Sequence, residues 1–221
     1  MKKSLYLCGL MAMTLAGTAS AAVVVEDSDW TVNTPIPEGN PVGITEYQTF
    51  SGLSGAPISD VSVDLNISGG YNGSLYGYLV LQDANGNVAT EVLLNQIGTS
   101  AANQFGSSGA GMDVTLSDSG TVNGTIHNVT GIPTGAWQPD SANTLDGTYG
   151  GLTANGTWTL FLADLGTGGS QSTLVSWGLD ISAVPESSPT GLLAGLGALL
   201  VVSTGSLLKT KRLNFHTGKK L

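Results

Sequence analysis

Residues 155–181 read NGTWTLFLADLGTGGSQSTLVSWGLDI, and this stretch decides the fold. Its apolar residues alternate with period two in two runs, which are Trp158, Leu160 and Leu162, and then Val175, Trp177, Leu179 and Ile181. Such alternation is typical of β-strands that bury one face. The Asn155-Gly156 pair and the glycines between the runs favour turns. The stretch therefore predicts two strands joined by a Gly-rich turn, with Trp158 and Trp177 as core residues.

The same pattern extends toward the N-terminus as far as residue 45. Asn-Gly pairs, which suit hairpin turns, recur at 72–73, 85–86 and 123–124. Short apolar or alternating runs predict further strands at 45–50, 61–67, 75–82, 88–94, 112–116 and 125–129, and no segment shows helical periodicity. We expect an all-β jelly-roll or β-sandwich domain of about eight short antiparallel strands over residues 44–183. Residues 22–43 are expected to form an extended lead-in with at most one strand.

The charge distribution is one-sided. All 16 Asp and Glu residues lie between Ala22 and Thr190, and all seven Lys and Arg residues lie outside that segment. Binding of DNA or RNA needs cations that contact phosphate, so we exclude a nucleic-acid partner. Hydrophobic residues make up 41% of the chain, which is enough to form a core.

The N-terminus has the features of an export signal. Lys2 and Lys3 precede a mostly apolar run, which ends at the small residues Ala19-Ser20-Ala21. This pattern predicts a signal peptide over residues 1–21, and the alternative of a membrane anchor is disfavoured because the run is short. The one cysteine, Cys8, lies inside it, so we expect a mature chain without disulfides.

The C-terminus predicts a membrane span. Residues 191–208 carry no charge and are followed at once by the basic cluster Lys209, Lys211 and Arg212. Eighteen residues form about 27 Å of helix, near the thickness of a bilayer core. Cations at the C-terminal flank place the basic tail, residues 209–221, in the cytoplasm. The domain is then periplasmic and anchored in the inner membrane.

The segment before this span carries the first family resemblance. Val184, Pro185 and Glu186 open the short segment 184–190, which precedes the apolar helix and the basic cluster. This three-part arrangement resembles the PEP-CTERM sorting signal of Gram-negative bacteria. The resemblance implies exosortase as a partner, with removal of the tail and release to the cell surface or the extracellular space. Ser187 departs from the pattern, because the family usually has a second proline there.

A second resemblance covers residues 44–183. It is carried by V-S-V-D-L-N-I at 61–67, G-S-L-Y-G-Y-L at 73–79, W-Q-P-D at 137–140, N-G-T-W-T-L at 155–160 and L-V-S-W-G-L at 174–179. These motifs resemble the P domain, or Homo B domain, which follows the catalytic domain in kexin-like and furin-like proprotein convertases. The resemblance implies a jelly-roll module that supplies no catalytic residue. Ser74 departs from it, because many P domains have Asp at that position.

Little in the domain suggests chemistry. His127 is the one histidine between Ala22 and Thr190, and no G-x-S-x-G elbow occurs, so we expect no catalytic triad and no enzyme. Transition-metal sites that need several His or Cys ligands are excluded by the counts. Residues 83–87 begin like an EF-hand loop, but Val88 and Leu94 stand at positions that need ligands.

Calcium is the only cofactor that the residues and the P-domain resemblance together suggest. Asp83 and Asp164 are the candidate ligands, since the domain has no cations to pair with its carboxylates. The alternatives are structural. Asp83 would belong to a hairpin loop, and Asp164 would accept hydrogen bonds from the amides of its own turn.

Three functions follow from these observations. The first is a non-catalytic exported protein whose P domain is a binding or structural module at the cell surface or in the extracellular matrix. The second is an accessory P domain that acts with a subtilisin-like serine endopeptidase. The third is a carbohydrate-binding adhesin module for exopolysaccharide, which would use exposed aromatic residues among Tyr71, Tyr76, Tyr78, Trp137 and Tyr149. The partner is exopolysaccharide, a surface protein or a protease.

Overall fold

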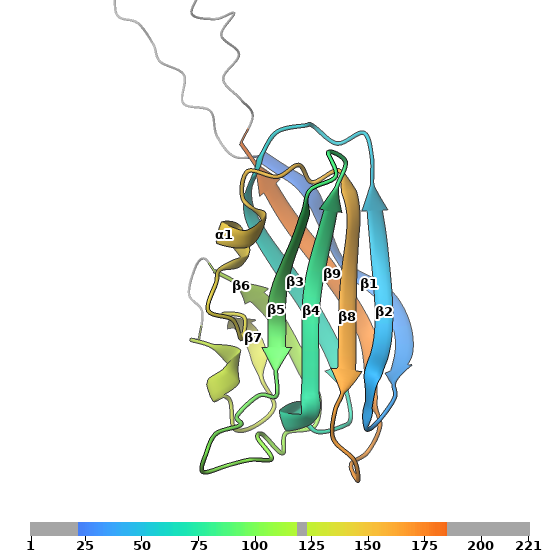
Figure 1. Ribbon diagram of the computed structural model, residues 1–221, viewed down its shortest axis with the longest axis vertical. Coiled ribbons are helices and arrows are strands. Elements are labelled where there is room, and N and C mark those ends of the chain that lie inside the picture. Colours follow the sequence, from blue (N-terminus) through green and yellow to red (C-terminus); the bar gives the residue numbers. More distant parts are fainter. Residues whose placement is uncertain (1–21, 119–122, 185–221) are drawn as a thin grey trace, which may run out of the picture. The chain divides into compact units, whose positions relative to one another are not determined.

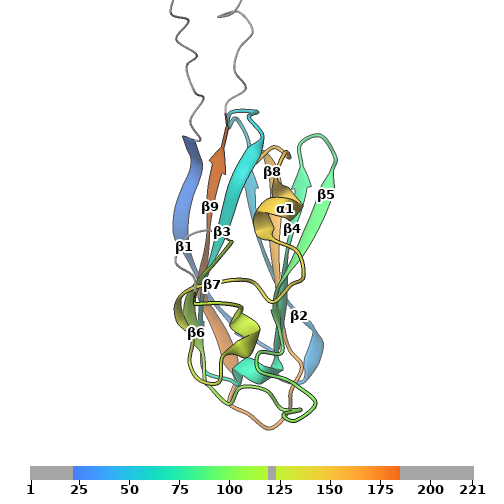
Figure 2. The ribbon, with the colours of Figure 1, turned by 90° about the vertical axis from the view of Figure 1, so that its left-hand side faces the viewer.

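The domain is a sandwich of two β-sheets (Figures 1 and 2). The structure is a computed structural model, and it describes residues 22–118 and 123–184. The five-stranded sheet has the order β1-β9-β3-β6-β7, and the four-stranded sheet has the order β2-β8-β4-β5. The strands are β1 (Ala22–Ile36), β2 (Asn40–Phe50), β3 (Ile58–Ser68), β4 (Leu75–Asp83), β5 (Val88–Asn95), β6 (Met112–Ser117), β7 (Thr134–Trp137), β8 (Gly156–Asp164) and β9 (Ser172–Ala183).

The all-β class predicted from the sequence is confirmed, and several elements differ in detail. Residues 22–43 are part of the sandwich, because β1 pairs with β9 along its length and β2 begins at Asn40. There are nine described strands, and β7, which pairs in parallel with β6, was not expected. The predicted strand 125–129 is instead a 3₁₀ turn at Ile126–Asn128. One short helix, α1 (Leu145–Tyr149), is present.

The terminal predictions lie outside the described residues. These are the signal peptide, Pro185 and Glu186 of the sorting motif, the span 191–208, and Lys209, Lys211 and Arg212. Val184 is the last residue described, and its N–H donates to the carbonyl of Pro57 at 3.1 Å. Within residues 22–118 and 123–184, no helix is both long and apolar enough to cross a membrane.

The core lies between the sheets and is centred on two tryptophans. The alternation in β3, β8 and β9 directs every second side chain inward, and Trp158 and Trp177 are fully buried. Trp158 packs against Tyr149 with ring centroids 5.1 Å apart, and Trp177 packs edge-on against Trp30 at 4.9 Å. Each indole therefore ties an element outside its own strand to the core.

Helix α1 lies at an open side of the sandwich, where it contacts β3 of one sheet and β5 of the other (Figure 2). Thr144 caps it by accepting from the N–H of Gly147 at 3.0 Å. The hydroxyl of the buried Tyr149 donates to the carbonyl of Leu79 at 2.7 Å. The helix therefore joins the two sheets through a polar contact as well as through burial.

The two ends of the sandwich differ. Ala22 pairs with Ala183, so β1 begins and β9 ends at the same end of the domain. The loops that join β3 to β4, β5 to β6 and β8 to β9 lie at the opposite end (Figure 1). These loops are therefore far from Ala22 and Ala183.

We predict that Tyr149→Phe destabilises the domain by about 1 kcal/mol, because the buried carbonyl of Leu79 loses its hydroxyl donor while the ring packing stays. Urea unfolding followed by tryptophan fluorescence measures the change. The matched control is Tyr47→Phe, since Tyr47 is 68% exposed and is expected to change stability by less than about 0.5 kcal/mol. Equal effects of the two substitutions would contradict the assigned contact.

Candidate functional site

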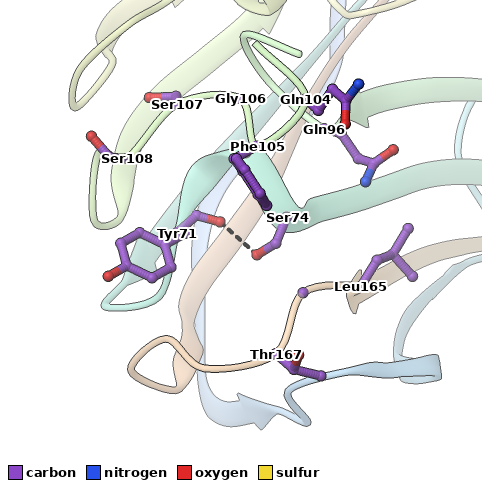
Figure 3. Close-up of a pocket in the computed structure, with 12 residues that line it drawn as sticks. Tyr71, Ser74, Gln96, Gln104, Phe105, Gly106, Ser107, Ser108, Leu165 and Thr167 are labelled. Carbon is purple, nitrogen blue, oxygen red and sulfur yellow. Dashed lines mark hydrogen bonds between the residues drawn. The ribbon is translucent and has the colours of Figure 1, made fainter. Parts of the chain in front are cut away.

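Three loops enclose a pocket of about 380 Å³ at the end of the sandwich opposite Ala22 and Val184 (Figure 3). We call it the loop pocket. Its side chains carry no carboxylate and no cation. It is lined by Tyr71, Gly73 and Ser74 of the β3–β4 loop, Gln96, Gln104, Phe105, Gly106, Ser107 and Ser108 of the β5–β6 loop, and Leu165, Gly166 and Thr167 of the β8–β9 loop. Its volume lies in the range of small-ligand sites, about 300–1,000 Å³.

The β3–β4 loop contributes a 3₁₀ turn, Asn72–Ser74. The Ser74 hydroxyl donates to the carbonyl of Tyr71 at 2.8 Å, which is the dashed line in Figure 3. Asn72 is buried and its amide donates to the carbonyl of Gly111 at 2.8 Å. Gly73 is required here, since a Cβ would lie 2.2 Å from the Phe105 carbonyl. The β5–β6 loop can therefore pack backbone against backbone on this turn.

The β5–β6 loop is held in shape by its own hydrogen bonds. Ser107 donates from its N–H to the carbonyl of Ile97 at 2.7 Å, and its carbonyl accepts from the N–H of Gly73 at 2.9 Å. The Asn103 amide donates to the carbonyls of Gly106 at 2.9 Å and Gly98 at 3.2 Å. The pocket is therefore formed before any ligand arrives, which lowers the entropy cost of binding.

Two residues of this loop stand out, Phe105 by its exposure and Gln96 by its backbone conformation. Phe105 is 90% exposed, and in Figure 3 its ring stands beside Ser74, with Gln96 and Gln104 on one side and Tyr71 on the other. Gln96 has φ of 51°, and among the described non-glycine residues only Asn33 shares a positive φ. An L-residue pays about 1–2 kcal/mol in that region. Such strain points to a functional constraint, which we assign to the pocket.

The wall of the loop pocket that the β8–β9 loop forms depends on Asp164, one of the predicted calcium ligands. Its buried carboxylate accepts from the N–H of Gly166 at 3.2 Å and from the hydroxyl of Ser172 at 3.1 Å. The next N–H, of Leu165, donates to the carbonyl of Ser74 at 2.9 Å. Asp164 thus shapes the turn that bounds the pocket. This is the structural alternative to calcium binding, in which Asp164 accepts hydrogen bonds from its own turn.

Asp83, the other predicted calcium ligand, closes the β4–β5 hairpin. It accepts from the N–H groups of Asn85 at 2.9 Å and Asn87 at 2.8 Å, and from the amide side chain of Asn87 at 2.9 Å. Burial acts to raise the pKa of Asp83, but these hydrogen bonds outweigh it and hold the pKa below its usual value.

The structure does not bring the two candidate ligands together. Asp83 pairs with Gly156 and Asp164 pairs with Leu75, so they stand at opposite ends of β8 and cannot share an ion. Over residues 22–118 and 123–184, no group of three or more His, Cys, Asp or Glu side chains is arranged to hold a metal ion.

A group of carboxylates surrounds α1 instead. Asp118 accepts from the N–H of Asp146 at 2.7 Å, and Asp146 accepts from the N–H of Val61 at 3.0 Å. Burial and the neighbouring negative charges, including Glu91 beside Asp118, raise the pKa of Asp118 and of Asp146. A carboxyl whose pKa is raised by folding contributes stability at low pH and loses that contribution as pH rises through the folded pKa. These two groups therefore favour the fold in mild acid.

The aromatics proposed for sugar recognition are scattered. Tyr71 lines the loop pocket, Tyr76 and Tyr78 lie on the four-stranded sheet, Trp137 is in β7, and Tyr149 is buried in the core. Phe105, Gln96 and Gln104 were not predicted from the sequence. The loop that carries them has no periodicity, and the positive φ of Gln96 leaves no trace in the sequence.

His127, which does not line the pocket, contacts the β5–β6 loop and holds it in place. Its Nδ1 lies 2.7 Å from a carboxylate oxygen of Asp140, and its Nε2 lies 2.9 Å from the carbonyl of Thr99. Both neighbours are acceptors, so both are satisfied only when the ring carries two protons. The hydrogen bond to Asp140 raises the pKa of His127, against the opposing effect of burial. The imidazolium therefore links Asp140, before α1, to the loop that carries Phe105.

Comparisons with known proteins add likenesses of fold only. No protein-family profile matches the chain, and no curated protein sequence matches it. The chain is similar to the Aeromonas sobria serine protease in complex with the chaperone ORF2, with 14% identity and a TM-score of 0.43 over 75% of this chain and 27% of that one. It is also similar to the serine protease of Aeromonas sobria, with 12% identity and a TM-score of 0.41 over 75% of this chain and 28% of that one. Neither likeness is close enough to transfer an activity or a partner.

We predict that His127→Gln loosens the β5–β6 loop. Amide hydrogen exchange of residues 97–107 should quicken about tenfold, because the loop loses a charge-assisted hydrogen bond. Since folding raises the pKa of His127, its contribution is complete below about pH 6.5 and disappears as pH rises through the folded pKa.

Exchange of the wild type and the variant, once corrected for the intrinsic pH dependence, should therefore converge in mild alkali. Asn128→Gln is the control in the same 3₁₀ turn, and it should leave the loop unchanged. A difference between wild type and His127→Gln that does not depend on pH would refute the imidazolium assignment.

Proposed function

We propose that this chain is an exported, non-catalytic binding protein with a P-domain-like β-sandwich that holds its ligand in the loop pocket. The observation that carries the proposal is Phe105, whose 90% exposed ring stands on a loop that several hydrogen bonds, including those of Asn103 and Ser107, hold in place. In a preformed pocket, such a side chain offers apolar area that a ligand can bury with little further loss of entropy. The strained Gln96 in the same pocket supports this assignment.

We further propose that export follows the signal peptide and that exosortase processes the PEP-CTERM-like tail. In this view residues 191–208 hold the domain at the inner membrane until processing, and the protein then reaches the cell surface or the extracellular space. The loop pocket lies at the end of the domain opposite Val184.

The non-catalytic role is supported by the chemistry of the pocket. No His, Cys, Asp, Glu or Lys side chain lines it, so the pocket lacks the side chains that most often act as general bases. His127 has both ring nitrogens engaged with acceptors. Covalent labelling of a serine by a fluorophosphonate probe would overturn this part of the proposal.

A neutral sugar is the ligand that the pocket chemistry favours. Amide and hydroxyl side chains both donate and accept hydrogen bonds, as sugar hydroxyls do, and Phe105 offers a face for the C–H side of a sugar ring. Anionic ligands are disfavoured because the domain has no Lys or Arg and many carboxylates. Exopolysaccharide of low charge is thus the proposed partner, and an accessory role beside a subtilisin-like protease is the alternative.

We predict that the protein is retarded in native gels containing a neutral polysaccharide, such as hydroxyethylcellulose or dextran, and not in gels containing alginate. Phe105→Ala should weaken the retardation about tenfold, which corresponds to about 1.4 kcal/mol of lost stacking. The matched control is Ile132→Ala, an exposed apolar residue that does not line the loop pocket, and it should bind normally.

The outcomes separate the ligand class from the binding role. If neutral polysaccharides have no effect but Phe105→Ala abolishes capture of an exported protease, the accessory role is favoured over sugar binding. If neither Phe105→Ala nor Gln96→Gly alters binding to any carbohydrate or to any protein of the envelope fraction, the loop pocket is not a binding site.

We predict that a chain lacking residues 191–221 is released in soluble form, whereas the full chain fractionates with the inner membrane. In the full chain, Leu199→Arg should disfavour insertion by about 2.5–3.5 kcal/mol, because a charge is placed near the centre of the span. Leu199→Ile is the control and should fractionate like the wild type. Unchanged membrane partitioning after the deletion would refute the anchor.

A further inference from the structure

The outer face of the four-stranded sheet contains no charged residue. Its outward positions are alternate residues of four strands, namely 45–49 in β2, 157–161 in β8, 76–82 in β4 and 88–92 in β5. Every one of them is Thr, Tyr, Val, Phe or Gln. The acidic residues of these strands lie elsewhere, since Glu91 is buried and Glu46 accepts from the Thr34 hydroxyl at 2.7 Å. We call this surface the uncharged face.

The uncharged face is open and ordered. No described element lies over it in Figure 1. The cross-strand pair Tyr78 and Phe161 stacks at 4.6 Å with an angle of 17° between the rings, and Tyr47 is 68% exposed on the neighbouring strand. In the centre, Val80 pairs with Thr159. Apart from Gln82, the side chains are thus β-branched or aromatic, and they lose little entropy when covered.

The outer face of the five-stranded sheet, by contrast, carries several carboxylates. Asp60 and Asp64 alternate with the buried Val61, Val63 and Leu65 of β3, so they occupy its outward side. Their strand neighbours add Asp180, which pairs with Ser62, and Asp113, which pairs with Asn66. The domain therefore has one acidic face and one uncharged face.

We propose that the uncharged face is a self-association surface on which a second copy of this chain docks, sheet against sheet. Two copies of a domain without Lys or Arg repel each other wherever carboxylates meet. Docking through the uncharged faces leaves both acidic faces turned outward, so this arrangement keeps the carboxylates of the two copies far apart. Sheets that pack face to face at about 10 Å are a common solution for such surfaces.

The size of the surface indicates a weak dimer. Four strands about 4.8 Å apart, each with about eight residues at about 3.3 Å, present roughly 500 Å². Two such faces bury roughly 1,000 Å² in total, near the lower limit of specific interfaces. Association should therefore be reversible and should depend on local concentration, which anchoring in one membrane or binding to one polymer would raise.

Thiol crosslinking of the full chain in cells tests the proposal. In a Cys8→Ser background, Val80→Cys puts a single thiol at the centre of the uncharged face, and Asn66→Cys puts one on the acidic face. With a short bismaleimide, Val80→Cys should give a species of twice the chain mass and Asn66→Cys should give none.

Adding a negative charge to one face or the other completes the test. Adding Thr159→Asp to the Val80→Cys variant should abolish the crosslink, because each docked pair would bury two unpaired carboxylates. The control is Asn66→Asp in the same Val80→Cys variant. It adds the same charge on the acidic face and should leave the crosslink intact. Protease resistance of each variant controls for folding. Equal crosslinking at both thiols would indicate random collision and overturn the proposal. The proposal would also be overturned if the Val80→Cys thiol reacts with N-ethylmaleimide but forms no dimer. It would be overturned too if a different molecule covers this thiol and blocks its reaction.

Discussion

Burial of two tryptophans, on one interior strand of each sheet, is the interaction on which the sandwich depends. β8 pairs with β2 and β4, and β9 pairs with β1 and β3, so each of these strands has a neighbour on both sides. Trp158 and Trp177 project from them into one core. Within residues 22–118 and 123–184, His127 is the only basic side chain, so ion pairs contribute little elsewhere. Apolar burial must therefore supply nearly all of the stability.

Polar side chains in this domain mainly satisfy the backbone of Gly-rich loops. Asp83 and Asp164 each accept hydrogen bonds from turn amides, and Asp118 and Asp146 accept from amides near α1. Glycine-rich turns leave many N–H groups without strand partners, and a buried carboxylate is a strong acceptor for them. A carboxylate in such a loop therefore resembles a metal ligand in sequence while serving as a structural acceptor. The walls of the loop pocket depend on this use of Asp164.

The sequence predicts the strands best where burial is regular. Alternation located β3, β4, β8 and β9 to within a few residues, because each faces the core on one side. It allowed one strand within residues 22–43 but gave no bounds for β1, where three register shifts break the period, and it missed β7, which has only four residues. The run 125–129 has strand-forming residues but turns at Ile126–Asn128. The loop pocket and the His127 contacts join residues distant in sequence, and no local pattern encodes them.

An acidic domain without Lys or Arg has two ways to manage its carboxylates. It can satisfy them with amide donors, which lower the pKa of Asp83, or bury them beside other carboxylates, where burial first and repulsion second raise the pKa of Asp118 and of Asp146. Both ways constrain where another molecule can approach, because an uncompensated carboxylate must be desolvated in any contact. The loop pocket and the uncharged face are surfaces free of that cost. The two proposed binding surfaces therefore differ in what they offer a partner: the loop pocket offers hydrogen bonding and shape, and the uncharged face offers flat contact without charge.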